Sequence, residues 1–222
     1  MKVILVGASN PEVKRLIIAI QKVHPDFEVL GFIDNDPEKR GKEFMGFPVF
    51  GGFEILDQWN RTDTYFVNLI TRDTRTRFET SKYLVQSGCQ FTNLIHPSID
   101  LNMVEYGVGC YFQEGCVIQA GVRVGNNSSM GALVHVGHDS QIGSSVFLAH
   151  GCCISGLTTI EDGVFIGTNA TVLPRLMLGR WSTIGAGAVV INDVPAYATV
   201  VGNPAKIIKL EIPVYQDADI FG

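Results

Sequence analysis

Five histidines are the residues of this sequence best suited to acid–base chemistry, and their positions separate them. A neutral imidazole can remove a proton from an attacking amine or hydroxyl group. His24 and His96 each precede a proline in loop-like sequence, so we interpret them as ordinary loop residues. The other three, at positions 135, 138 and 150, belong to one segment, which is therefore the first place to look for chemistry.

His138 is the leading candidate for a general base. It lies two places after a large apolar residue and is followed by Asp139, whose carboxylate could fix the tautomer of the ring. Because adjacent side chains of a strand point to opposite faces, Asp139 can reach the ring only if the chain turns between them. His150 follows Leu148 in the same way and competes with His138, whereas His135 directly precedes its apolar neighbour and is expected to point outward.

Polar residues also follow the expected strands of the N-terminal half. Gly7 and Ser9 lie where a strand enters a helix, so backbone N–H groups there could hold a phosphate. Asp34 and Asp36 follow a second strand, where two interpretations stand equally: a ligand-binding pair of carboxylates and a simple Asp-rich turn. Arg72 follows a third strand and could pair with a pyrophosphate. The first loop lacks a G-x-G-x-x-G pattern, which argues against a dinucleotide redox cofactor.

Composition excludes several classes of protein. The chain has 222 residues, is 46% hydrophobic, and carries a formal net charge of −5 without a Lys/Arg-rich block, so a general nucleic-acid surface is not expected. No stretch is apolar and long enough for a signal peptide or a membrane span, and we expect a cytoplasmic protein. The five cysteines include no C-x-x-C pair, which predicts buried thiols and no metal site.

The first half alternates between strand-like and helix-like segments, which predicts parallel strands with helical crossovers. Apolar residues recur at helical spacing from Val13 to Val23, and a second helix is expected at about 76–86. The expected strands are Lys2–Val6, Glu28–Ile33, Tyr65–Ile70 and Phe91–Ile95. We therefore predict an α/β domain over residues 1–97.

The second half has a period of six. Every sixth residue from Phe112 to Val190 is large and apolar, fourteen in succession without an exception. If about half of all residues are apolar, such a run arises by chance with odds on the order of one in ten thousand. Glycine directly follows seven of these positions, and we attribute it to backbone freedom at a bend. The pattern predicts an all-β solenoid over residues 98–222.

In such a solenoid each six-residue step is a short strand and a corner, and three steps close a triangular coil. Residues eighteen apart then stack in adjacent coils, which places Gly156 directly over His138. His150 is twelve residues beyond His138, so these two histidines lie at different corners and can face each other only across a subunit boundary. The backbone N–H of Gly156 is our candidate for stabilising an oxyanion formed near His138.

The repeat, together with the closing Gly202-Asn203-Pro204-Ala205-Lys206, resembles the left-handed β-helix acyltransferases. With its N-terminal α/β domain the whole chain is similar to the sugar acetyltransferases related to sialic acid O-acetyltransferase, a group that includes N-acetyltransferases of nucleotide-linked amino sugars. The resemblance implies a small Rossmann-like parallel α/β domain followed by a left-handed parallel β-helix. It also implies acetyl-CoA as co-substrate, a homotrimer, and a role in bacterial surface glycan synthesis.

The resemblance also implies roles for particular residues. His138 matches the position of the family's histidine, and Asp139 matches its acidic neighbour. The positions that match donor contacts, or could meet the donor's phosphates, are Gly156, Thr168, Arg175, Ala186 and Lys206. The positions expected to bind the nucleotide-linked sugar are Gly7, Ser9, Asp34, Asp36 and Arg72.

We therefore expect direct acetyl transfer from acetyl-CoA to the amine of a nucleotide-linked amino sugar, such as a 4-amino-deoxy sugar, with no metal and no covalent intermediate. Three alternatives remain open from the sequence. One is O-acetylation of a sialic acid or another sugar, the second is a non-catalytic hexapeptide-repeat assembly subunit, and the third is an acyltransferase that uses an acyl carrier as donor. The sequence also leaves open whether His138 acts alone, with Asp139 or with His150.

Overall fold

The computed structural model describes residues 1–59, 63–213, 215, 220 and 221. Its N-terminal part is a six-stranded sheet in the order β3-β4-β2-β1-β5-β6. All neighbouring strands are parallel except the β3–β4 pair. The strands are β1 (Lys2–Val6), β2 (Glu28–Ile33), β3 (Glu43–Phe44), β4 (Phe47–Gly51), β5 (Thr64–Asn68) and β6 (Gln90–Phe91).

Helices cover both faces of this sheet, because consecutive apolar side chains of β1 point to opposite faces and both faces must be buried. Val3 and Leu5 pack against α1 (Val13–Val23), while Ile4 and Val6 pack with α2 (Thr74–Gln86) and the 3-10 helix η1 (Phe53–Gln58). The predicted strands Lys2–Val6 and Glu28–Ile33 are confirmed. A parallel sheet between two layers of helices requires apolar side chains on both of its faces.

The predicted strand Phe91–Ile95 is wrong, because this segment contains two short strands in different sheets. β6 ends at Phe91 and completes the N-terminal sheet, whereas β7 (Leu94–Ile95) pairs with β9 (Tyr111–Phe112) of the solenoid. The solenoid sheet therefore begins before the predicted boundary at residue 97. The five residues from Phe91 to Ile95 could not reveal by their types alone that the chain changes sheets at Thr92 and Asn93.

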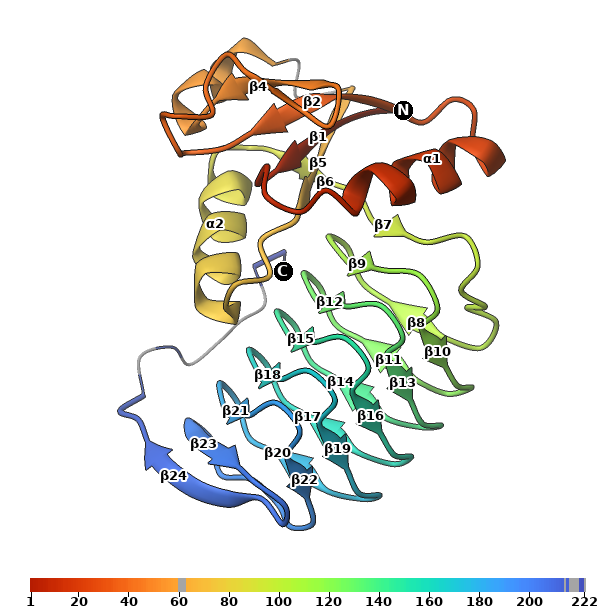
Figure 1. Cartoon of the computed structure of the whole chain (residues 1–222), viewed down its shortest axis with the longest axis vertical. Coiled ribbons are helices and arrows are strands. Elements are labelled where there is room, and N and C mark those ends of the chain that lie inside the picture. Colours follow the sequence, from red (N-terminus) through yellow and green to blue (C-terminus); the bar gives the residue numbers. More distant parts are fainter. Residues whose placement is uncertain (60–62, 214, 216–219, 222) are drawn as a thin grey trace.

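The C-terminal part is a parallel β-helix of stacked coils, which descend below the N-terminal sheet in Figure 1. Its three sheets have the orders β10-β13-β16-β19-β22, β20-β17-β14-β11-β8 and β24-β23-β21-β18-β15-β12-β9-β7. The remaining strands are β8 (Glu105–Tyr106), β10 (Val117–Ile118), β11 (Arg123–Val124), β12 (Ser129–Met130), β13 (His135–Val136), β14 (Gln141–Ile142), β15 (Phe147–Leu148), β16 (Cys153–Ile154), β17 (Thr159–Ile160), β18 (Phe165–Ile166), β19 (Thr171–Val172), β20 (Met177–Leu178), β21 (Thr183–Ile184), β22 (Val189–Val190), β23 (Ala198–Val201) and β24 (Lys206–Leu210).

The predicted period is confirmed by the pairing register and by burial. Strands pair with strands eighteen residues away, as in Val136 with Ile154 and Ile154 with Val172. All fourteen apolar residues of the six-residue series belong to one core and are at most 7% exposed. Burial of this continuous apolar column is the main stabilising contribution to the solenoid.

The glycines that follow the apolar residues are required for a different reason from the one predicted. At Gly137 a Cβ would lie 2.3 Å from the backbone nitrogen of Gly156 in the next coil, and at Gly179 it would lie 2.3 Å from the nitrogen of Ala196. These glycines give the next coil room to stack. The left-handed conformation falls two residues later, at positions such as Leu133 (φ 62°) and Asp139 (φ 56°).

A fully buried arginine joins the two parts of the chain. Arg77, on α2, is 0% exposed. Its guanidinium donates to backbone carbonyls of the N-terminal sheet and its loop, at Asn68 (2.6 Å) and Ile70 (3.3 Å), and of the solenoid, at Asn127 (2.8 Å) and Gly109 (3.0 Å). Burial lowers the pKa of Arg77 to about 10, so it still carries its charge near neutral pH.

Side-chain hydrogen bonds surround the arginine and continue into the coils. Asn68 donates to Ser81 on α2, Ser81 donates to Asn127, and Asn127 donates to Ser145 one coil further on. All four side chains are fully buried. A connected polar network of this kind fixes one relative position of two packed units, because any shift leaves buried groups without partners.

Replacing Arg77 with Ala should lower the free energy of unfolding by about 3–5 kcal/mol, because it opens a cavity and leaves buried carbonyls without donors. Chemical denaturation of the full chain measures this. Arg123→Ala is the matched control. The guanidinium of Arg123 is exposed and pairs with Glu105 on the solenoid surface, so the free energy of unfolding should fall by less than about 1 kcal/mol. Equal losses in the two variants would contradict the assigned role of Arg77.

Candidate active site

His138 and Asp139 form a hydrogen-bonded pair at a corner of the solenoid. The corner follows β13, and the positive φ of Asp139 turns its carboxylate back toward the preceding residue. Asp139 Oδ2 lies 2.9 Å from His138 Nδ1. In a regular strand the side chains of His138 and Asp139 would point to opposite faces. The turn brings them together, and the hydrogen bond that the sequence made conditional on such a turn is formed.

This pair defines the chemistry available to the ring. An ionised carboxylate only accepts hydrogen bonds, so Nδ1 of His138 carries a hydrogen and a neutral ring has its lone pair on Nε2. Both side chains are more than half exposed, at 58% and 60%. The His138 backbone N–H is held by Gln119 Oε1 at 2.9 Å, which ties the corner to the preceding coil. The ring is therefore oriented, accessible and able to accept a proton.

Gly156 lies directly against this ring, as the eighteen-residue stacking predicts. A Cβ at Gly156 would lie 2.9 Å from His138 Nε2, and the carbonyl of His138 accepts a hydrogen bond from the next residue, Leu157. Within the described part of the chain, the Gly156 N–H donates to no acceptor. Glycine at this position keeps a polar N–H beside the imidazole and leaves space above it.

Two edges of the solenoid carry the predicted donor-binding positions. The His138 edge contains Ala120, His138 and Gly156, and Arg175 continues it through its N–H bond to the Gly156 carbonyl. The His150 edge contains Ala132, His150, Thr168 and Ala186, linked by the same kind of corner hydrogen bond. Like Gly156, Thr168 and Ala186 have backbone N–H groups without an acceptor among the described residues.

These two edges are different corners of one triangle, so a single chain does not bring them together. Thr168 and Ala186 can share a groove with His138 and Gly156 only if one edge comes from a second copy of the chain. Lys206 lies at the exposed start of β24, and the N–H of the preceding Ala205 donates to the Val189 carbonyl of the last coil.

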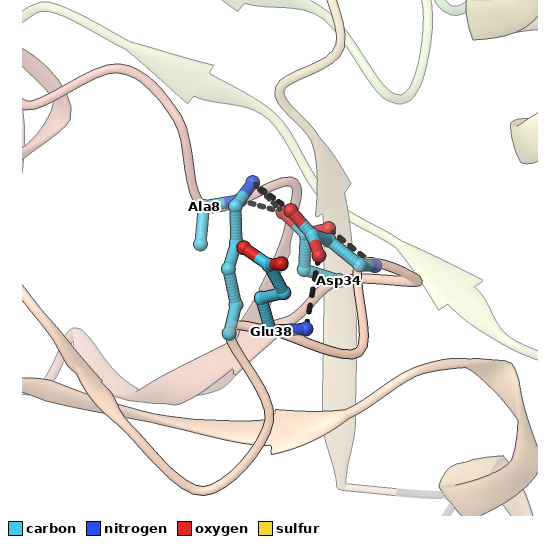
Figure 2. Close-up of polar contacts among 5 residues, drawn as sticks. Ala8, Asp34 and Glu38 are labelled. Atoms are coloured by element: carbon cyan, nitrogen blue, oxygen red, sulfur yellow. Dashed lines mark hydrogen bonds and ion pairs between the residues drawn. The ribbon is translucent and has the colours of Figure 1, made fainter.

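The loop after β1 is organised by Asp34, as Figure 2 shows. Its carboxylate accepts from the Ala8 N–H (2.8 Å), the Asp36 N–H (2.9 Å) and Lys39 Nζ (2.8 Å). Burial alone would raise the pKa of Asp34, but these hydrogen bonds and the charge of Lys39 outweigh it and lower the pKa. Asp34 therefore holds the Gly7–Ala8 turn, where Gly7 has a φ of 99°.

Ser9 and Asp36 lie beside this network. Ser9 lines a cavity of about 400 Å³ together with Lys39, Lys42 and Phe44. Asp36 accepts a hydrogen bond from the Glu38 N–H at 3.0 Å, which makes the Asp-rich turn that the sequence also allowed. A phosphate or nucleoside entering here would meet the loop backbone and two lysines.

Arg72 is not brought to that cavity. It lines a separate one of about 400 Å³ with Arg75, Trp181 and Glu211, where Arg75 and Glu211 form an ion pair. The sequence placed Arg72 correctly after a strand, but the direction of the following loop carries it toward the solenoid.

A cavity of about 580 Å³ was missed by the sequence interpretation. It lies between the start of α1 and the His150 edge. Tyr111 and Gln113 line it from the first coil, and Asn10 and Glu12 line it from the N-terminal loop. Glu114, also in its lining, was recognisable in principle, because it lies thirty-six residues before His150 and hence at the same corner.

Within the described ranges no helix is long and apolar enough to cross a membrane. No group of three His, Cys, Asp or Glu side chains that could hold a metal ion occurs among the described residues.

Known proteins share the repeat and the fold of this chain. Residues 157–192 match the bacterial transferase hexapeptide (six repeats) family. The acetyltransferase domain of PglB from Neisseria gonorrhoeae FA1090 superposes on 93% of this chain and 99% of its own, with a TM-score of 0.82 and 26% identity. The chain carries the left-handed hexapeptide-repeat fold. The resemblance predicted from the sequence is confirmed.

Two further proteins to which the chain is similar have names that state their ligands or activity. PerB from Caulobacter crescentus, solved with CoA and GDP-perosamine, matches 94% of this chain and 98% of its own, with a TM-score of 0.71 and 25% identity. The 2,3,4,5-tetrahydropyridine-2,6-dicarboxylate N-acetyltransferase of Clostridium perfringens is 54% identical over 50 residues, 22% of this chain. The chain spans only about a fifth of the length of this curated relative (21%).

Asp34 should make the stability of this hexapeptide-repeat chain pH-dependent. Since its folded pKa is lowered, its contribution is complete above the ordinary pKa of about 4 and is lost as the pH falls through the lower folded value. Asp34→Asn should therefore be less stable than the wild type at pH 7, and the gap should narrow below about pH 4. Denaturation at a series of pH values measures it, and exposed Asp26→Asn should show little gap at any pH.

Proposed function

We propose that this protein is an acetyl-CoA-dependent N-acetyltransferase that acetylates the amino group of a nucleotide-linked amino sugar. The observation that carries the proposal is the His138–Asp139 pair directly beside the free N–H of Gly156. A base and an oxyanion donor that share one small space are what acyl transfer to an amine requires. PglB and PerB, which have the same fold over nearly the whole chain, support this class of reaction.

In the proposed reaction the sugar nitrogen attacks the carbonyl carbon of the thioester, and a C–N bond forms. Nε2 of His138 accepts the proton lost by the nitrogen, and Asp139 stabilises the imidazolium through Nδ1–H. The N–H of Gly156 donates to the oxyanion of the tetrahedral intermediate. The C–S bond then breaks, and the proton passes from His138 to the departing thiolate.

The donor groove is proposed to lie between copies of the chain. Gly156 and Arg175 would line it from the His138 edge, and Thr168 and Ala186 from the His150 edge of a second copy, with their free N–H groups available to the amides of the donor's pantetheine arm. Lys206 would meet a phosphate at its end. Three copies close such an arrangement, which supports the expected homotrimer.

The N-terminal domain, residues 1–97, is proposed as a Rossmann-like nucleotide-sugar-binding unit, and residues 98–222 as the acyltransferase unit. The sheet of the N-terminal unit and the Gly7–Ser9 loop at the carboxyl end of β1 support its assignment as a nucleotide-binding unit. Asp34 acts by shaping the loop, and Asp36 remains a proposed contact of the nucleotide. Arg72, which lines the separate cavity beside Trp181, is not proposed as a contact of the same nucleotide. The five free cysteines fit the reducing conditions of the cytoplasm, where we place the protein.

A thiol-release assay over UDP-, GDP- and dTDP-linked amino sugars tests the proposal. Each amino sugar is paired with the analogue that carries a hydroxyl in place of the amine. Turnover of an amino sugar but not of its hydroxyl partner is expected. Preference for the hydroxyl partner would establish a sugar O-acetyltransferase instead, and absence of acetyl-CoA binding would favour a non-catalytic assembly subunit.

His138→Ala should lower kcat by roughly two to four orders of magnitude, because it removes the proposed general base. Asp139→Asn should lower kcat less, since it weakens the orientation of the ring but leaves the imidazole in place. Steady-state kinetics on the best substrate of the panel measure both effects, and circular dichroism verifies the fold. Near-normal turnover of His138→Ala would remove it as the base.

Gly156→Val should weaken acetyl-CoA binding at least tenfold, because the added carbons occupy the space beside His138 Nε2. Isothermal titration with acetyl-CoA measures the change. The neighbouring Ser155→Ala serves as control and should bind the donor as the wild type does. Unchanged affinity in Gly156→Val would refute the placement of the donor.

A further inference from the structure

The large cavity beside α1 contains a second oriented histidine, His150. The ring lies against the preceding coil, and its Nδ1 is 2.9 Å from the backbone nitrogen of Ala132. That backbone group is a donor, so Nδ1 of His150 is the acceptor and a neutral ring carries its hydrogen on Nε2. Nε2 therefore has a free lone pair in His138 but carries a hydrogen in His150.

The opposite tautomers follow from the partners that each ring meets. At His138 the partner of Nδ1 is a carboxylate, Asp139, which only accepts. At His150 it is an N–H group, which only donates. Two histidines at equivalent corner positions are thus prepared for opposite tasks. His150 can donate to an oxygen but holds no free lone pair with which to remove a proton.

The lining of the cavity has the character of a sugar subsite. Its volume, about 580 Å³, suits a hexose with part of its linkage. Tyr111 and Gln113 form a polar floor and are only 2% and 6% exposed. Burial raises the pKa of Tyr111 to about 12, so its hydroxyl stays protonated and able to donate. Leu16 and Leu133 add apolar walls for the C–H faces of a ring.

Charges at the mouth of the cavity are already paired. Arg15 on α1 contacts Glu12 (3.0 Å) and, across to the solenoid, Glu114 (3.3 Å). The groups that can select a neutral, hydroxyl-bearing ring are therefore the donors further in, namely the Tyr111 hydroxyl, the Gln113 amide and His150 Nε2–H. Of these, His150 is the exposed one.

We propose that His150 is a specificity-determining residue, whose Nε2–H donates a hydrogen bond to an oxygen of the sugar ring held in this cavity, and that it is not a base. The inference rests on the proposed function and assigns the sugar subsite. Since His138 of the same chain lies on another edge, the base that reaches a sugar in this cavity comes from a second copy.

The solenoid supplies matched replacements for His150. At the corresponding corner position, Asn126 Oδ1 accepts from the Val108 N–H (2.8 Å) and Asp162 Oδ1 accepts from the Ser144 N–H (2.7 Å). His150→Asn should therefore keep the bond from Ala132 and still present an N–H donor. His150→Asp should keep the same bond but present only an acceptor. His150→Ala is a neutral variant without a donor.

Steady-state kinetics of the full-length protein, with the best nucleotide-linked amino sugar of the panel, test the proposal. His150→Asp and His150→Ala should raise KM for the sugar about tenfold, the loss of one hydrogen bond, with kcat changed less than threefold. His150→Asn should stay within about threefold of the wild type in KM. All three should keep the pH profile of kcat, and His24→Asn, outside the cavity, should match the wild type.

Nitrogen-15 NMR of the histidine rings gives a readout that does not depend on turnover. The wild type should show an Nε2–H ring that disappears in His150→Asn and an Nδ1–H ring that disappears in His138→Ala. A fall in kcat or a lost pH limb in the His150 variants would make His150 a base and overturn the inference, as would unchanged KM in all three. If the wild type acetylates no amino sugar, the proposed function itself is overturned. If the wild type turns over normally and the three His150 variants keep its KM, only the inference about His150 is overturned.

Discussion

The stacking of coils eighteen residues apart is the constraint on which the rest of this structure depends. It buries one apolar side chain at each of three faces in every coil and brings backbones so close that Gly137 and Gly179 leave no room for a Cβ. The same closeness gives the site its precision. Gly156 lies against the His138 ring because the next coil can lie nowhere else once its apolar residues are in the core.

The candidate site lies at a corner of the repeat that has polar residues, His138 and Asp139. The third residue of a corner adopts a left-handed conformation. Gly or Asn occupies it at several corners, bulky residues such as Leu133 and Trp181 occupy it at others, and at one corner it is Asp139. That conformation turns its carboxylate toward His138. A structural requirement of the corner therefore orients the ring, and no separate loop is needed to do so.

The buried Arg77 performs the corresponding task between the two parts of the chain. Its donors end on carbonyls at the end of β5 and in the loop after it, and on carbonyls of the first coils, which ties that loop to the solenoid. A guanidinium suits this position because its planar fork of donors matches several fixed carbonyls at once. The cavity that contains His150 lies across the same junction, so its shape depends on this connection.

The sequence by itself determined the solenoid, its eighteen-residue stacking and the place of Gly156 over His138, because a strict period in one dimension translates directly into neighbours in space. It also determined the strands at Lys2–Val6 and Glu28–Ile33, since short β-branched runs between helical patterns are local signals. Tertiary structure alone decided the tautomers of the two histidines, the path of Arg72 away from the β1 loop, and the cavity at the domain junction. Each of these depends on side-chain directions and on contacts between segments far apart in the chain, for which a local pattern contains no information.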